Sequence, residues 1–204
     1  MKLWYSKTSP FSRKVLVTIY HHHLEEQIEF ALTTVAFDAQ APHNQDNPLG
    51  RVPALRTKEG IWLYGSYTIV DYLDSLSDKD KFIPTDFHRY EILALHSLAD
   101  GILENAMPML VERLNRPSEY WWNERHKQYT DRCRASFQQL EEIIFSQPFS
   151  LNIGTITAVA VIDWWILRQN YLDISLQEEF PKLIDWNRKM TDTYPELDRS
   201  WSFT

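Results

Sequence analysis

The hydrophobic pattern of this chain changes character once, near residue 80, and this change limits the folds open to it. Before it, short alternating segments are interleaved with helical stripes, whereas every periodic segment after it is helical. The elements expected in the first part are, in order, a strand over 2–6, a helix from Ser9, a strand over 27–35, a loop over 36–50, a hairpin of 53–57 and 61–64, and a helix from Ser66. This order predicts a mixed α/β domain over residues 1–77.

A short charged segment, residues 77–84, ends in proline and is typical of a linker. Beyond it, helices are expected over 87–115 with a kink at Pro108, over 117–145, over 152–168 and over 178–191. The helix from residue 152 has no charge before Asp163, so we expect it to be buried on nearly all sides. The predicted fold class is therefore α/β plus all-α, with an all-helical domain over 87–204.

Charge and cysteine content argue against several classes of protein. The formal net charge of −7 argues against a general nucleic-acid binder, which would show a basic face. The single cysteine, Cys133, can form no internal disulfide, which favours a reducing compartment. The start of the chain lacks the apolar stretch of a secretory signal, and the longest uncharged apolar run, 153–162, is shorter than the about 20 residues that span a bilayer. We therefore expect a cytoplasmic protein that binds neither nucleic acid nor membrane.

Three short turns carry the candidate functional groups. In the first, Ser9 precedes Pro10, which places a hydroxyl at the N-cap and proline at the first helical position. The second, residues 47–55, reads Asn-Pro-Leu-Gly-Arg-Val-Pro-Ala-Leu and contains an X-Pro bond. The third, Gly65-Ser66, puts another hydroxyl at a helix start. Helix N-termini carry partial positive charge and free N–H groups, so both helix starts favour bound anions.

The domain order and the three turns together resemble the cytosolic glutathione S-transferases, of the bacterial kind with a serine-type active site, over essentially the whole chain. The resemblance implies a thioredoxin-like, glutathione-binding domain over 1–77, glutathione as co-substrate, and a homodimer. It implies conjugation of glutathione to a small apolar electrophile, in a detoxification role. It further implies a cis bond before Pro53 and pairing of the Val52 backbone with the cysteinyl backbone of glutathione.

Under this resemblance, Ser9 is the candidate catalytic hydroxyl. Placed at a helix N-terminus, it would donate a hydrogen bond to the glutathione sulfur and favour the nucleophilic thiolate. An N-cap side chain points at its own helix, so Thr8, Ser12 and Tyr5 remain alternatives. No cysteine lies beside Pro10, which argues against the classes that form a mixed disulfide with glutathione.

The resemblance also assigns partners to the rest of glutathione. Ser66 and its helix would hold the γ-glutamyl carboxylate. Gly65 occupies the position where the family usually has an acidic residue or glutamine. One contact to the γ-glutamyl amino group is therefore expected to be missing, and Asp100 is a candidate to supply that contact. Arg51, and less strongly His43, could meet the glycyl carboxylate.

The sequence constrains the identity of the electrophile and the overall reaction less closely than it constrains the glutathione site. Candidate wall residues for the electrophile site are Phe11, Met107, Met109, Trp121 and Trp122, although each also suits a core. Two alternatives stay open besides conjugation. One is a glutathione-dependent isomerase or dehalogenase, and the other is a non-catalytic glutathione-binding or regulatory protein, which Gly65 favours.

Two further patterns predict local structure rather than chemistry. Residues 152–155, Asn-Ile-Gly-Thr, match the place of a capping box in the family's helical domain, and Thr155 instead of an acidic residue predicts loss of the reciprocal hydrogen bond. The run His21-His22-His23 predicts a solvated helix end, because adjacent side chains point in different directions and do not form a metal site.

Overall fold

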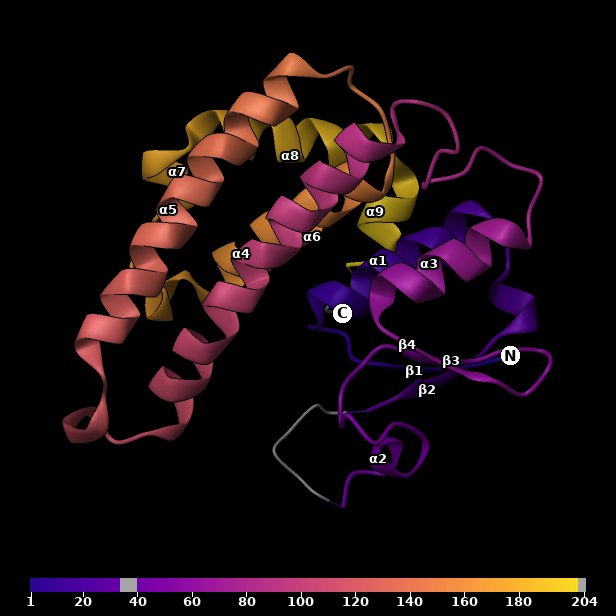
Figure 1. The fold of residues 1–204 in the computed structure, drawn as a ribbon, viewed down its shortest axis with the longest axis horizontal. Helices are drawn as coiled ribbons and strands as arrows, with labels where there is room; N and C mark the ends of the chain where they lie inside the picture. The colour runs from indigo at the N-terminus through magenta and orange to yellow at the C-terminus, as the bar shows by residue number, and fades with distance from the viewer. Residues whose placement is uncertain (34–39, 202–204) are drawn as a thin grey trace. The chain divides into compact units, whose positions relative to one another are not determined.

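The computed structural model describes residues 1–33 and 40–201, and they form two compact units. The first unit is Met1–Pro84 together with the segment that begins at Tyr194, and the second is Thr85–Thr193 (Figure 1). The domain boundaries expected from the sequence, 1–77 and 87–204, stay predictions. Among the described residues, no helix has the length and apolar character needed to cross a membrane.

The first unit is built on a four-stranded sheet with the order β2-β1-β3-β4. Its strands are β1 (Lys2–Tyr5), β2 (Glu29–Leu32), β3 (Ala54–Arg56) and β4 (Trp62–Tyr64). Strand β1 runs parallel to β2 and antiparallel to β3, which pairs antiparallel with β4. Before β2, residues Glu25–Gln27 form the 3-10 turn η1, so the second strand begins later than expected. The end of that expected strand, residues 34 and 35, lies outside the described residues.

Two helices, α1 (Pro10–His21) and α3 (Ser66–Ser75), lie side by side on one face of the sheet, and the short α2 (His43–Asp46) lies on the other (Figure 1). The helices turn their apolar stripes towards the sheet. The fully buried side chains at this boundary come from β1, β3, α1 and α3: Leu3, Leu55, Val15, Ile19, Ile69 and Leu73. This mixed α/β layer confirms the first half of the predicted fold class and carries the three turns at one end of its sheet.

The helix α9 (Pro195–Arg199) returns to α1 and completes the first unit. Arg13 on α1 is only 2% exposed, so its guanidinium depends on protein partners. Its Nε lies 3.1 Å from Ser200 Oγ and its Nη2 lies 3.1 Å from the Leu197 carbonyl, while the ring of Trp201 covers it at 4.4 Å. The sequence pattern did not predict α9, because five residues are too few to show a helical period.

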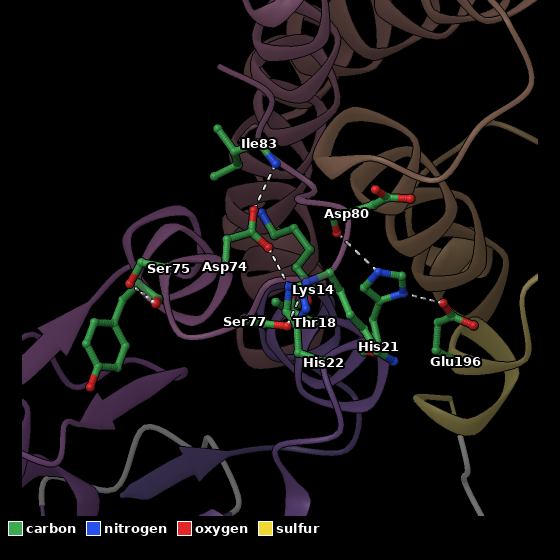
Figure 2. Close-up of polar contacts among 12 residues, drawn as sticks. Lys14, Thr18, His21, His22, Asp74, Ser75, Ser77, Asp80, Ile83 and Glu196 are labelled. Atoms are coloured by element: carbon green, nitrogen blue, oxygen red, sulfur yellow. Dashed lines mark hydrogen bonds and ion pairs between the residues drawn. The ribbon is translucent and has the colours of Figure 1, made fainter. Parts of the chain in front are cut away.

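The histidine run at the end of α1 is not the solvated end that was expected (Figure 2). The side chain of His22 is buried, and its Nε2 lies 2.8 Å from Asp74 Oδ1 on α3. Asp74 Oδ2 also accepts a hydrogen bond from the Ile83 N–H, at 2.9 Å. His21 Nδ1 lies 2.9 Å from Glu196 Oε1. The prediction was wrong because His22 on α1 binds Asp74 on α3, and Asp74 in turn binds the segment before residue 84.

The second unit is entirely helical apart from its connections, which confirms the second half of the predicted fold class. Its elements are α4 (Arg89–Asn115), η2 (Ser118–Tyr120), α5 (Asn123–Ser146), α6 (Ile153–Arg168), η3 (Gln169–Tyr171), α7 (Leu176–Glu179) and α8 (Pro181–Thr193). Helix α4 continues through Pro108 and packs against α5 and α6. The helix expected over 117–145 starts later, because the backbone at Trp121 is extended. Likewise, Phe180 separates α7 from α8 within the helix expected over 178–191.

Helix α6 is the buried centre of the second unit, as its uncharged sequence predicted. The Asn152 side chain accepts a hydrogen bond from the Thr155 N–H at 3.0 Å, and the Thr155 hydroxyl accepts one from the Asn152 N–H at 3.0 Å. The expected loss of the reciprocal bond was therefore wrong, because a threonine hydroxyl can replace the usual carboxylate. Gly154 allows the close approach to α4, since a Cβ there would lie 2.9 Å from the Ile92 carbonyl.

Candidate functional site

The strand register brings the three turns to one end of the sheet. Trp4 pairs with Ala54, and Ala54 pairs in turn with Tyr64. The chain therefore leaves β1 after Tyr5, enters β3 from Pro53 and leaves β4 after Tyr64 at the same sheet end. This end of the first unit gathers two helix N-termini and a proline turn, and it is the candidate site.

Ser9 is the N-cap of α1, which is one of the two roles considered for it from the sequence. Its Oγ accepts a hydrogen bond from the Ser12 N–H at 3.1 Å. A hydroxyl oxygen has a second lone pair and its own O–H donor, so capping leaves the proton of Ser9 free to donate. The side chain is half-buried. The geometry therefore allows Ser9 to cap its helix and still donate to a ligand.

The alternative hydroxyls lie in different surroundings. Ser12 is fully buried, and its Oγ lies 3.4 Å from the Ser6 N–H, so a ligand does not reach it from solvent. Thr8 is half-buried in the loop after β1. Tyr5 ends β1, and its ring meets the edge of Phe30 at 5.9 Å between centroids. Thr8 and Tyr5 therefore stay alternatives to Ser9, whereas Ser12 is disfavoured.

The proline turn has the geometry that the resemblance implied, since the Val52–Pro53 peptide bond is cis. The buried side chain of Asn47 organises the residues before it, a role that sequence reasoning missed. Its Nδ2 donates to the Arg51 carbonyl at 2.7 Å and its Oδ1 accepts from the Leu49 N–H at 3.0 Å. The only sequence signal was an asparagine opening a Pro/Gly turn. Asn47 thus positions the backbone that leads into Val52.

The preceding helix α2 is attached to the face of the sheet opposite to α1 and α3. Trp4 Nε1 donates to Asp46 Oδ2 at 2.7 Å, and the Tyr64 hydroxyl donates to the Asp46 carbonyl at 3.1 Å. Lys2 Nζ lies 3.6 Å from the same carboxylate. These contacts connect α2, and through it Asn47, to β1 and β4.

The start of α3 has no side-chain cap. Gly65 occupies its N-cap position with φ 82°, a conformation that glycine adopts readily, and it has no side chain to offer the helix. Ser66 follows and is buried. The first N–H groups of a helix have no intrahelical acceptors, so this uncapped end is suited to a carboxylate.

The remaining predicted residues are not all at this sheet end. Phe11 lies in the first turn of α1, with Lys14 Nζ 5.0 Å from its ring centre. Arg51 is exposed. Asp100 lies on α4 in the second unit, where its Oδ2 is 3.5 Å from His96 Nε2. Burial raises the pKa of Cys133 to about 12, so this thiol does not supply a thiolate at neutral pH.

Of the residues suggested for an electrophile site, Met109 and Trp122 line one cavity of the second unit. Trp121 is adjacent in sequence but instead donates its Nε1–H to the Arg116 carbonyl at 2.9 Å. Met107 is half-buried on α4, and Phe11 belongs to the first unit.

Sequence and structure comparisons point to one family. Residues 8–76 match the family model described as glutathione S-transferase, N-terminal domain. The uncharacterised GST-like protein YibF of Escherichia coli strain K12 is 26% identical over 174 residues, which are 83% of this chain and 84% of that protein.

Two similar crystal structures come from a glutathione transferase family member of Pseudomonas fluorescens Pf-5. The structure with bound glutathione is 28% identical, with a TM-score of 0.88, covering 98% of this chain and 97% of that chain. The structure with bound S-(propanoic acid)-glutathione is 26% identical, with a TM-score of 0.86, and the whole of both chains is covered. Residues 8–76 therefore form a glutathione S-transferase N-terminal domain, and the chain is similar over nearly its full length to glutathione transferase family members.

Proposed function

We propose that this protein is a glutathione transferase that conjugates reduced glutathione to small apolar electrophiles, as a cytoplasmic homodimer with a role in detoxification. The observation that carries the proposal is the meeting of three features at one sheet end: the hydroxyl of Ser9 at the start of α1, the cis bond before Pro53, and the uncapped start of α3. The glutathione bound to the Pseudomonas fluorescens relative supports the same ligand for this chain.

In this proposal, Ser9 lowers the pKa of the glutathione thiol. A free thiol has a pKa of about 8.5 and is mostly protonated at neutral pH. The Ser9 O–H would donate to the sulfur, and the positive end of the α1 dipole would favour the thiolate, which is the nucleophile. The thiol proton leaves to solvent as the thiolate forms. The thiolate then attacks the electrophilic carbon and the new C–S bond forms, while the electron pair of the broken bond departs with the leaving group or, in an addition, moves onto the electrophile, which takes a proton from solvent.

The peptide part of glutathione would be held by the other two turns. The backbone of Val52 pairs with the cysteinyl backbone like an added strand. The start of α3 and Ser66 receive the γ-glutamyl carboxylate. We assign Arg51 to the glycyl carboxylate and Asp100 to the γ-glutamyl amine, in place of the side chain that Gly65 lacks.

The test is an ultraviolet difference titration with reduced glutathione at neutral pH, which detects the thiolate band, followed by turnover with an electrophile. Ser9→Ala should reduce the band and the turnover, while losing only about 1 kcal/mol of stability as a lost N-cap. Ser12→Ala and Thr8→Val are matched controls that should keep the band. A full band in Ser9→Ala and its loss in Thr8→Val or Tyr5→Phe would move the role to that residue.

A non-catalytic glutathione-binding protein is the second candidate, and Gly65 favours it because one contact to the γ-glutamyl amine is absent. Titration calorimetry with reduced glutathione, compared with the thiolate band, distinguishes the transferase from the non-catalytic binding protein. Glutathione binding without any thiolate band would support this second function, and a saturable band would exclude it.

A further inference from the structure

The short helix α2 comes directly before the turn that contains the cis bond to Pro53, so its position decides where that turn lies. A helix of four residues is not stable by itself, because its few hydrogen bonds do not offset the cost of ordering the chain. Its place therefore depends on contacts with other elements. The sheet supplies them, on the face opposite to α1 and α3 (Figure 1).

Two side chains of β1 contact the carboxylate of Asp46, the last residue of α2. Lys2 and Trp4 lie two residues apart on this strand, so both point to the same face of the sheet. Trp4 Nε1 donates to Asp46 Oδ2 at 2.7 Å, and Lys2 Nζ lies 3.6 Å from the same oxygen. Lys2 Nζ also lies 4.5 Å from the centre of the Trp4 ring. Each of the three side chains thus contacts the other two.

The indole contact is the stronger of the two that Asp46 receives from β1. A hydrogen bond of 2.7 Å to a carboxylate is short and charge-assisted. The contact with Lys2 is longer, and the side chains of Lys2 and Asp46 are 30% and 31% exposed, so solvent screens this ion pair. Trp4 rather than Lys2 therefore fixes the position of Asp46.

A second contact holds the same residue from β4. The Tyr64 hydroxyl donates to the Asp46 carbonyl at 3.1 Å. The strand register pairs Ala54 with Trp4 on one side and with Tyr64 on the other. Trp4 and Tyr64 therefore flank the residue that follows Pro53, and they fix the end of α2 beside the start of β3.

The turn between α2 and the cis bond is closed by Asn47, which directly follows Asp46 and is only 1% exposed. Its side chain donates to the Arg51 carbonyl at 2.7 Å and accepts from the Leu49 N–H at 3.0 Å. Its own carbonyl accepts from the Gly50 N–H at 2.9 Å. Because these bonds tie the turn to Asn47, a displacement of α2 would also move the backbone that leads into the cis bond.

The hydroxyl that the proposed function assigns to thiol activation is held by different contacts. Ser9 Oγ accepts from the Ser12 N–H at 3.1 Å, and the Ser9 N–H donates to the Ser6 carbonyl at 3.2 Å. These bonds lie within the loop after β1 and the start of α1, so a change at α2 should leave them in place. Glutathione affinity and thiol activation should therefore respond to different substitutions.

We propose that Trp4 is a positioning residue for glutathione binding. By holding Asp46 on the sheet, it keeps the Val52 backbone in the arrangement that receives the cysteinyl part of the peptide. This role rests on the proposed function, which assigns Val52 to that contact. Without the indole hydrogen bond, only a fraction of the molecules has the turn in this arrangement, and the apparent affinity falls by that fraction.

The test is titration calorimetry of the intact protein with reduced glutathione, together with the thiolate band at saturation. Trp4→Phe keeps an aromatic ring but loses the N–H donor. It should weaken glutathione binding about tenfold, the value of one hydrogen bond to a charged group, and leave the thiolate fraction at saturation unchanged. Ser9→Ala should instead reduce the thiolate fraction.

Variants of Asp46 test the contact itself. Asp46→Asn keeps an acceptor oxygen for the indole and should retain most of the affinity, whereas Asp46→Ala should lose as much as Trp4→Phe. The double variant should bind no more weakly than Asp46→Ala alone, because both changes remove the same bond. Trp62→Phe is the matched control, since it makes the same substitution at the other end of β4 from Tyr64. It should leave the affinity and the thiolate fraction unchanged.

A measurement without glutathione follows the turn directly. The Leu49 and Gly50 amides donate to Asn47, so their hydrogen exchange reports how often the turn opens. Trp4→Phe should speed this exchange about tenfold, since it removes the same hydrogen bond, and Trp62→Phe should not change it.

Unchanged affinity in Trp4→Phe, or equal weakening by Trp62→Phe, would overturn the role of Trp4 and leave the proposed function standing. A loss of the thiolate fraction in Trp4→Phe would overturn it too, because the contact would then act on Ser9. If the unmodified protein bound no glutathione, the proposed function would fail and the binding role of Trp4 with it. The exchange rates would then still show whether the indole holds the turn.

Discussion

At the residue scale, Gly65 suits the backbone conformation required at the start of α3, but it lacks the side chain that would contact the γ-glutamyl amine. Its φ of 82° is unfavourable for any residue with a Cβ, yet a Cβ at this position would meet nothing within 4 Å. The family that the chain resembles usually places an acidic residue or glutamine here. In this chain, glycine adopts the conformation readily but offers no side chain to the γ-glutamyl amine.

Gly65→Gln should therefore tighten glutathione binding and lower stability by about 1 kcal/mol, the usual cost of a left-handed residue. Calorimetric titration and chemical denaturation measure the two effects. Gly60→Gln is the matched control, because Gly60 has φ 85° and lies in the β3–β4 hairpin at the opposite sheet end. It should lose similar stability with no gain in affinity. Equal affinity in both variants would contradict the role given to this position.

A second prediction at this scale concerns His126. Burial, and then the positive charge of Arg113, lowers the pKa of His126 below its usual value, although Asp173 acts in the opposite direction. In the unfolded chain the pKa is about 6.5, so below that pH the unfolded state takes up a proton before the folded state does. Stability should fall as the pH drops from about 6.5 to the lowered pKa, and then level off.

His126→Gln should flatten this part of the stability curve. The comparison is the slope of unfolding free energy against pH, between about pH 7 and 5, in the variant and in the unmodified protein. Identical slopes would mean that His126 titrates alike in both states.

At the element scale, what could be predicted follows the length and regularity of each element. Helix α6 was predictable because its apolar run has no alternative to burial, and α1 because Ser9-Pro10 marks its start. The five-residue α9 and the break at Trp121 were not, because they depend on distant contacts or on backbone angles that leave no periodic signal.

The candidate site shows the same division. Its turns could be predicted, since proline and glycine restrict the backbone locally. The role of Asn47 could not, because its hydrogen-bond partners are backbone groups that approach only after the turn has folded.

The contact between α4 and α6 gives a prediction at this scale. Gly154→Ala should destabilise the protein by roughly 1–3 kcal/mol, because the new methyl group would lie 2.9 Å from a backbone carbonyl of α4, which cannot move alone. Gly101→Ala on α4 is the control, since a Cβ there meets nothing within 4 Å. It should stabilise by up to about 1 kcal/mol through helix propensity. The melting temperatures of both variants test this prediction. Equal shifts in melting temperature would contradict the close approach of α6 to α4.

At the scale of the whole molecule, the first unit is made from two separate stretches of the chain. The buried guanidinium of Arg13 takes its acceptors from Leu197 and Ser200. Removing everything after Thr193 would take away these two acceptors and the Trp201 ring that covers the guanidinium, at a cost of at least about 2 kcal/mol.

The truncated chain should therefore unfold at lower denaturant concentration, and Arg13→Met should destabilise the full chain more than the truncated one. This difference is the decisive result, because it measures the contacts of Arg13 with the returning segment rather than the apolar area lost with that segment. If Arg13→Met lowered stability equally in both chains, the guanidinium would not depend on the returning segment.

The return of α9 to α1 also has a consequence for synthesis on the ribosome. A domain whose residues are contiguous can fold completely while the next one is still being translated. Here, the sheet and its two helices emerge first, but the acceptors that Leu197 and Ser200 offer to Arg13 exist only after the whole helical unit has been made. During that interval the nascent first unit lacks these contacts. Codons that slow translation between residues 85 and 193 should therefore lengthen the exposure of this unit to chaperones and proteases.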